Sequence, residues 1–289
     1  MSGLEAFRRL ERAGLLVVGE GCRLSPDASL EPEDLIGTRR PVVLEDGCRI
    51  QGRARLHGGA RVGAGAVVED LAVVGAPEHG YAVGDTYPGQ GGPTQLGAGA
   101  VVRAGAVIYA GVSLGEETSI GHYTVVRSFV RIGSHSQLAH HLVVERETSV
   151  GDYVRCSPLS HITSATVLED RVFLGAGVVT VNDKSMIWKQ PDAEPTLIAP
   201  HVEYGATVGS GSTLGAGVRI GRQAMVGSGS LVLRDVPPHT VAYGVPARVH
   251  RTLDSPLQRG PESGAPAAPA DGPARPPPSA LAAGWGLEL

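Results

Sequence analysis

The sequence predicts an all-β fold in which short strands stack into a solenoid, and three observations support that prediction. An aliphatic residue returns at every sixth position over most of the chain, glycine is abundant at 41 of 289 residues, and aromatic residues make up only 4%. A period of six fits neither the repeat of an α-helix nor the two-residue alternation of a free strand. It is the period of a β-helix built from hexapeptides, each supplying one short strand and one corner.

The six-residue repeat falls in three blocks, at positions 44–74, 96–174 and 202–232. A small or β-branched residue usually stands two positions before each aliphatic residue, and a glycine that allows a tight corner often follows it. We expect the aliphatic side chains to fill a triangular prism whose coils each contain three hexapeptides, or eighteen residues. Cys156 takes one of these interior positions, so we interpret it as buried packing and not as a nucleophile.

Two breaks in the repeat predict loops that leave the solenoid, at residues 76–95 and 183–197. Loops carried by a rigid scaffold are where binding residues concentrate. Tyr81, one of the few aromatic residues, lies in the first loop and is a candidate for substrate binding. The alternative interpretation is that both loops are tolerated surface insertions.

The ends of the chain differ from the repeat and divide the sequence into regions. Residues 1–43 are predicted to form an N-terminal helix and cap, and residues 44–236 the β-helix itself. Residues 237–254 are predicted to close the other end, since the ends of a solenoid need caps. The proline-, alanine- and glycine-rich composition of residues 255–289 predicts a disordered tail.

Charge and cysteine content argue against several functional classes. The net charge of −4 gives no basic surface for nucleic acid or for an anionic membrane, and no apolar run is long enough to span a bilayer. The three cysteines are far apart and form neither a disulfide framework nor a paired metal motif, and no signal peptide is evident. We therefore expect a cytoplasmic protein that binds neither nucleic acid nor membrane.

A group of histidines marks the corners of the predicted prism. His122 and His140 are eighteen residues apart, so they should stack on one column in successive coils, with His141 beside them. An imidazole near its ordinary pKa of about 6.5 can accept a proton at neutral pH, as a general base must. The alternative is that these side chains are solvated or contact a neighbouring subunit.

Several stretches of the sequence also resemble those of a known protein family. Hexapeptides followed by "VPPHTVAYGVPARV" resemble the left-handed β-helix acyltransferase superfamily. Within it, "IGHYTVV", "LAHH", "LEDRVFLGAGVVTVNDK" and "GVPARV" resemble acetyl-CoA-dependent N-acetyltransferases that act on nucleotide-linked amino sugars. A shorter stretch around the first loop is similar to the UDP-N-acetylglucosamine acyltransferase of lipid A synthesis.

This resemblance implies a left-handed parallel β-helix, a homotrimer, acetyl-CoA as co-substrate and a nucleotide sugar as acceptor in a cleft between subunits. Backbone N–H groups at the corners are suited to stabilise the thioester oxyanion. The implied catalytic candidates are His122, His141 and His161, the substrate-binding candidates are His140, Asn182 and Asp183 together with Tyr81, and the cofactor-binding candidates are Gly209, Gly227 and Arg248.

The sequence departs from these N-acetyltransferases at one place. Where they often carry an asparagine-containing "QNN" stretch, this chain reads "CSPLSHIT", and Pro158 and Leu159 cannot supply the amide. His161, on an outward strand position nearby, is the candidate replacement. O-acetylation of a sugar or small-molecule hydroxyl therefore stays open as an alternative, and a non-catalytic trimeric scaffold is the alternative of another class.

No metal site is expected. The γ-class carbonic anhydrases share this fold and bind zinc through three histidines, two of them about two coils apart. No pair of histidines in this chain is thirty-six residues apart with a third in place.

Overall fold

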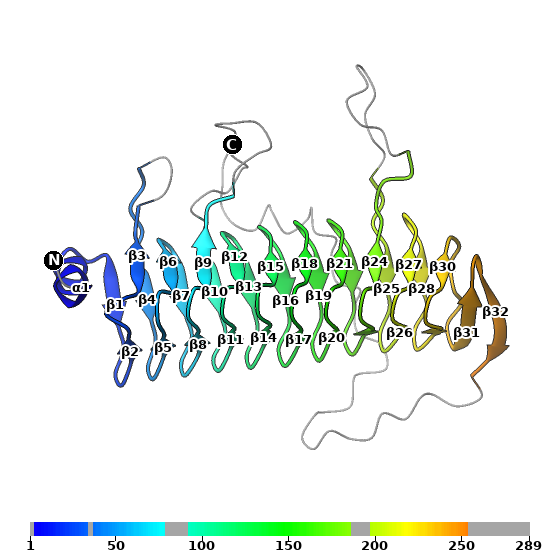
Figure 1. Cartoon of the computed structure of the whole chain (residues 1–289), viewed down its shortest axis with the longest axis horizontal. Coiled ribbons are helices and arrows are strands. Elements are labelled where there is room, and N and C mark those ends of the chain that lie inside the picture. Colours follow the sequence, from blue (N-terminus) through cyan, green and yellow to red (C-terminus); the bar gives the residue numbers. More distant parts are fainter. Residues whose placement is uncertain (1–2, 34–36, 79–91, 186–196, 254–289) are drawn as a thin grey trace.

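A computed structural model describes residues 3–33, 37–78, 92–185 and 197–253, and shows a long prism with three parallel sheets as its walls (Figure 1). The chain passes through the three sheets in turn, so that most strands pair with the strand three places later in the sequence. Each complete turn through sheets A, B and C is one coil. This architecture confirms the predicted left-handed parallel β-helix.

The strands of each sheet are given in the order in which they pair. Sheet A contains β1 (Leu16–Val18), β4 (Val42–Leu44), β7 (Ala60–Val62), β10 (Thr94–Leu96), β13 (Ser113–Leu114), β16 (Arg131–Ile132), β19 (Ser149–Val150), β22 (Val167–Leu168), β25 (His201–Val202) and β28 (Arg219–Ile220). Sheet B contains β2 (Arg23–Leu24), β5 (Arg49–Ile50), β8 (Val67–Val68), β11 (Val101–Val102), β14 (Ser119–Ile120), β17 (Gln137–Leu138), β20 (Arg155–Cys156), β23 (Phe173–Leu174), β26 (Thr207–Val208), β29 (Met225–Val226), β31 (Thr240–Gly244) and β32 (Ala247–Thr252). Sheet C contains β3 (Ser29–Glu31), β6 (Arg55–His57), β9 (Val73–Ala76), β12 (Val107–Tyr109), β15 (Val125–Val126), β18 (Val143–Val144), β21 (His161–Ile162), β24 (Val179–Thr180), β27 (Thr213–Leu214) and β30 (Leu231–Val232).

Both ends of the prism are covered. Helix α1 (Gly3–Arg12) lies at the first coil, where Phe7 is buried and Leu10 packs against the core. At the other end, β31 and β32 form an antiparallel hairpin that pairs with β29. The described residues contain no helix with the length and apolar character needed to cross a bilayer.

The interior is made of in-register columns of aliphatic side chains. A two-residue strand points one side chain inward and one outward, because successive side chains of a strand face opposite sides. Cys156 stands between Leu138 and Leu174 in one such column and is fully buried. Burial raises the pKa of its thiol to about 12, so the sulfur packs as an apolar group and is no nucleophile.

The solenoid begins before residue 44, since β1–β3 already form a coil. Val18, Leu24 and Leu30 are six residues apart, and in register they meet the first aliphatic residues of the predicted repeat. The residues between β3 and β4 lengthen this coil, so that Val18 and its partner Leu44 are 26 residues apart, not eighteen. Because of this extra length, the first coil does not follow the eighteen-residue spacing of the repeat.

The corner glycines have a different role from the one expected. Gly121, which follows the aliphatic residue of β14, does not have a positive φ. A Cβ atom there would lie 2.4 Å from the backbone carbonyl carbon of Ala139 in the next coil. The positive φ is instead at Tyr123 (55°), two residues after Gly121, and at His141 (57°), two residues after Ala139. Neither of these residues is a glycine. Gly121 is therefore favoured by the close approach of the neighbouring coil and not by its own backbone conformation.

The long connections all leave the prism along one edge. They follow β3, β9 and β24, the exit strands of sheet C, and lead to β4, β10 and β25 in sheet A. We call this the C–A edge, and call the edge between sheets B and C the B–C edge. In Figure 1 the described parts of these connections extend from the same side of the prism. Sheet C is thus the wall next to every excursion from the repeat.

Candidate functional site

The B–C edge brings together three of the predicted histidines. His122 follows β14 and His140 follows β17, one coil further on, and their rings stack with centroids 5.0 Å apart. His141 stacks in the same way on Tyr123, with centroids 5.4 Å apart. The eighteen-residue spacing in the sequence therefore corresponds to direct contact between the rings.

A backbone hydrogen bond orients His140. The N–H of His122 donates to Nδ1 of His140 at 3.0 Å, so this nitrogen is the acceptor and the neutral ring carries its proton on Nε2. Other corners use shorter side chains for the same purpose. Ser210 Oγ, for example, accepts the N–H of Ala176 at 3.1 Å on the same edge. His140 consequently ties two coils together and presents an Nε2–H donor, while the His122 ring stacks on it.

The carboxylate of Glu69 lies on the same edge, before His122. Burial alone would raise its pKa. Hydrogen bonds from Arg103 Nη1 at 2.6 Å and from the Ala104 N–H at 3.1 Å, together with the positive potential of His122, lower the pKa of Glu69 below its ordinary value. The histidine edge therefore carries a carboxylate that stays ionised at neutral pH.

A second polar cluster lies where sheet C meets the C–A edge. His161 points outward from β21, with its Nε2 3.6 Å from Oε1 of Glu145. Glu145 also pairs with Arg127, and Arg127 in turn pairs with Glu78, which is only 4% exposed and accepts the Ser128 N–H at 3.0 Å. Contact with His161 and Arg127 lowers the pKa of Glu145 in spite of its partial burial. An anionic Glu145 beside His161 is the arrangement that orients a histidine base.

The sequence interpretation did not identify Arg127, Glu145 or Glu78. A signal for the first two was present, because they are eighteen residues apart and so occupy one column in neighbouring coils. No comparable signal existed for Glu78, which reaches Arg127 from the start of the first excursion.

His122 and His161 belong to different clusters. His161 is in register with Val143, and Val143 with Val125, which lies in the coil of His122. Two coils at about 4.8 Å each separate the two histidines along the axis by about 10 Å. Outward-facing valines occupy the surface of sheet C between these clusters.

Asn182 and Asp183 form the root of the second excursion. Asn182 is half-buried in the wall of a cavity of about 300 Å³, and its backbone carbonyl accepts the Ile198 N–H at 2.7 Å. Asp183 pairs with Leu197 across the root, and its Oδ1 accepts the Ser185 N–H at 2.8 Å. Asp183 thus shapes the turn, and Asn182 faces the cavity. Tyr81 lies outside the described residues.

The three cofactor-binding candidates are on two different elements. Gly209 and Gly227 follow β26 and β29 on the B–C edge, in the same column as Gly121. Arg248 is exposed on β32 and donates to the neighbouring carbonyl of Ala247 at 3.0 Å. The structure therefore places the two glycines, but not the arginine, on the histidine edge. In the described ranges, no group of three or more histidine, cysteine or acidic residues is arranged to hold a metal ion.

Comparison with known proteins agrees with this architecture, although no family model matches the chain. The bifunctional protein GlmU of Methylibium petroleiphilum is 30% identical over 254 residues, covering 87% of this chain and 47% of GlmU. The GlmU of Albidiferax ferrireducens is 28% identical over 243 residues, covering 79% of this chain and 45% of that protein. The chain spans less than half the length of these relatives.

The solved structures add a likeness in fold. The Arabidopsis UDP-N-acetylglucosamine acyltransferase superposes with a TM-score of 0.55 at 17% identity, over 83% of this chain and 70% of that one. The chain is a hexapeptide-repeat β-helix protein. The resemblance to the hexapeptide-repeat acyltransferases is thereby confirmed in fold by the plant enzyme. Within this hexapeptide-repeat protein, the candidate site comprises the B–C edge and the outer surface of sheet C.

Proposed function

We propose that this hexapeptide-repeat protein is an acyltransferase that uses acetyl-CoA and N-acetylates a nucleotide-linked amino sugar. The stacked His122–His140 pair on the edge shared with Gly209 and Gly227 is the observation that carries the proposal. The plant structure supports the substrate class, because it is a UDP-N-acetylglucosamine acyltransferase.

The two rings have complementary roles in the proposed reaction. His122 accepts a proton from the acceptor group as it attacks the thioester carbon. The C–N bond forms, the C–S bond breaks, and the coenzyme A thiolate leaves and takes up a proton. The Nε2–H of His140 and corner N–H groups donate to the thioester oxygen while it carries negative charge. His141 and His161 stay predicted alternatives for the base.

A homotrimer is part of the same proposal. Val107, Val125 and Val143 form an outward apolar row on sheet C, flanked by the histidine edge, and a neighbouring subunit would cover it. The expected mass in solution is three times 29.8 kDa. A monomer at micromolar concentration in sedimentation would contradict an active site shared between subunits.

Transfer to a hydroxyl is the second candidate function. The observation that favours it is the corner after β20, where Pro158 and an exposed Leu159 offer no side-chain amide to an amino sugar. Losing the base should affect the two reactions differently. A hydroxyl must lose its proton as it attacks, whereas a neutral amine can lose it afterwards.

Release of coenzyme A tests the proposal. The full chain is assayed with acetyl-CoA against UDP- and dTDP-linked amino sugars and against their hydroxyl analogues. His122→Ala should lower kcat by about 10²–10⁴ for a hydroxyl acceptor and less for an amine. His135→Ala is the matched control, because His135 also stacks at a corner, on Tyr153 at 4.7 Å, but on the opposite edge of sheet B.

The alternative of a non-catalytic scaffold makes the opposite prediction. A ligand that binds only the folded state raises the melting temperature. If acetyl-CoA leaves the melting temperature unchanged and no acceptor releases coenzyme A, the proposed function is wrong and a scaffold is favoured.

A further inference from the structure

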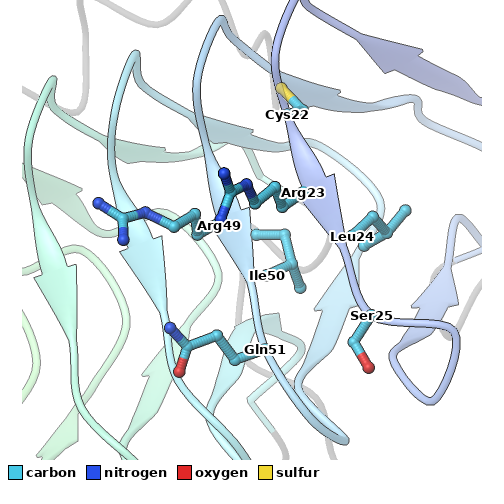
Figure 2. A pocket seen from close by; sticks show the side chains of 7 residues that line it. All are labelled: Cys22, Arg23, Leu24, Ser25, Arg49, Ile50 and Gln51. Atoms are coloured by element: carbon cyan, nitrogen blue, oxygen red, sulfur yellow. The ribbon is translucent and has the colours of Figure 1, made fainter.

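Two arginines occupy neighbouring positions on the outer face of sheet B near the helix-capped end. Arg23 of β2 is the register partner of Arg49 of β5, so their Cα atoms are about one strand spacing apart, ~4.8 Å. Both side chains are exposed, and Figure 2 shows them extending in the same direction. Like charges placed directly opposite on paired strands destabilise a sheet. A bound anion would relieve this repulsion.

The protein does not supply a compensating negative charge from the described residues. No carboxylate there lies within ion-pair distance of Arg23 or Arg49. Three acidic residues of the nearby coils have other partners. Glu45 pairs with Arg61 at 2.7 Å, Asp46 accepts the Glu20 N–H at 2.8 Å, and Asp70 pairs with Arg53 at 3.2 Å.

The arginines also line a hollow with neutral polar groups beside them. An open hollow of about 580 Å³ is lined by both arginines together with Cys22, Leu24, Ser25, Ile50 and Gln51 (Figure 2). That volume is within the range of small-ligand sites. The hydroxyl and the amide add neutral hydrogen-bond donors, and no acidic residue is part of the lining.

We propose that the cavity at Arg23 and Arg49 is a binding site for a diphosphate group. A guanidinium presents a rigid fork of N–H donors that matches phosphoryl oxygens two at a time. Two adjacent forks suit two linked phosphoryl groups better than a single carboxylate. The site is separate from the histidine edge, because β8 and β11 stand between β5 and β14 in sheet B.

Calorimetric titration of the full chain with inorganic pyrophosphate at constant ionic strength tests the site. Arg23→Gln and Arg49→Gln should each weaken binding roughly tenfold or more, because each removes charged hydrogen bonds. Arg155→Gln is the matched control. Arg155 has the same outward position on β20 of sheet B, but its register partners are Gln137 and Phe173.

A parallel titration with UDP identifies the source of the diphosphate. Tighter binding of UDP than of pyrophosphate, with the same sensitivity to both arginine variants, supports a nucleotide; equal affinity supports a simpler diphosphate. Absence of binding to wild type, unchanged binding in both variants, or an equal loss in Arg155→Gln would overturn the proposal. Melting temperatures confirm that the variants are folded. The titration requires no turnover, so its result does not depend on the proposed acyl transfer.

Discussion

Glu145 illustrates how one carboxylate can hold a functional side chain in place. It lies between His161 and Arg127, which come from the coils on either side, and both contacts favour its ionised form. Since Arg127 also binds the buried Glu78, the position of His161 is linked to the root of the first excursion. A histidine oriented in this way is suited to act as a base.

Replacing that carboxylate tests whether His161 takes part in the reaction. Glu145→Gln keeps the shape but removes the charge, so if His161 is the base we expect coenzyme A release to fall by roughly tenfold or more. Glu117→Gln is the control, because Glu117 pairs with His135 at 3.1 Å in an exposed position. Unchanged coenzyme A release in Glu145→Gln would leave Glu145 with a structural role only.

The three cysteines should differ sharply in reactivity. Cys156 and Cys48 are buried, and burial raises the pKa of each thiol to about 12, aided at Cys48 by the neighbouring Cys22. Cys22 is only half-buried. A thiol reagent should therefore label one cysteine quickly in the native protein and the other two only after unfolding, and Cys22→Ser should abolish the fast phase. Fast native labelling of Cys156 would contradict its place in the core.

At the scale of the element, the six-residue strand and corner were largely predictable. The aliphatic columns, the stacking of His122 on His140 and the burial of Cys156 all follow from spacing, because parallel in-register coils convert sequence distance directly into spatial neighbours. Contacts across an excursion do not follow, since their sequence offset depends on the length of the insertion. Glu78, 49 residues before Arg127, is such a case.

The corner glycines show a second limit of the sequence. Their recurrence was clear, but a one-dimensional pattern does not distinguish a glycine needed for backbone conformation from one needed for close contact. The distances between coils settle this for Gly121, whose added methyl group would meet the backbone of Ala139.

That contact yields a stability prediction. Gly121→Ala forces the corner of one coil away from the next and should lower the free energy of unfolding by about 1–3 kcal/mol. Ala139→Gly, in the same column one coil later, creates no clash and should change it by less than about 1 kcal/mol. Urea denaturation followed by circular dichroism measures both. Equal effects in the two variants would mean that the coils separate without strain.

At the scale of the whole molecule, stability should decline in acid through a set of partly buried carboxylates. Glu69, Glu145 and Glu169 all have pKa values held below the ordinary range, chiefly by hydrogen bonds from arginine, histidine or backbone N–H groups that outweigh burial. Their ordinary value in an unfolded chain is about 4.3. A depressed pKa contributes stability that is present above this value and is lost as the pH falls through the folded pKa.

The melting temperature of wild type should accordingly drop as the pH is lowered below about 4.3. Glu145→Gln should melt earlier than wild type at neutral pH, and the difference should shrink in acid, where Glu145 is protonated in both folded and unfolded chains. A difference that stays constant or grows on acidification would show that the ion pairs of Glu145 contribute little.

The C–A edge has a consequence for how such a molecule can change. Paired strands across the excursions are 26 residues apart at Val18 and Leu44, and 34 apart at Val62 and Leu96 and at Leu168 and Val202. The ladders of sheet A nevertheless keep their register. Insertions of different length can therefore be accommodated at the C–A edge without changing the register of the strands that flank them. Exchanging the excursions at this edge between related proteins would alter ligand recognition while leaving the three sheets unchanged.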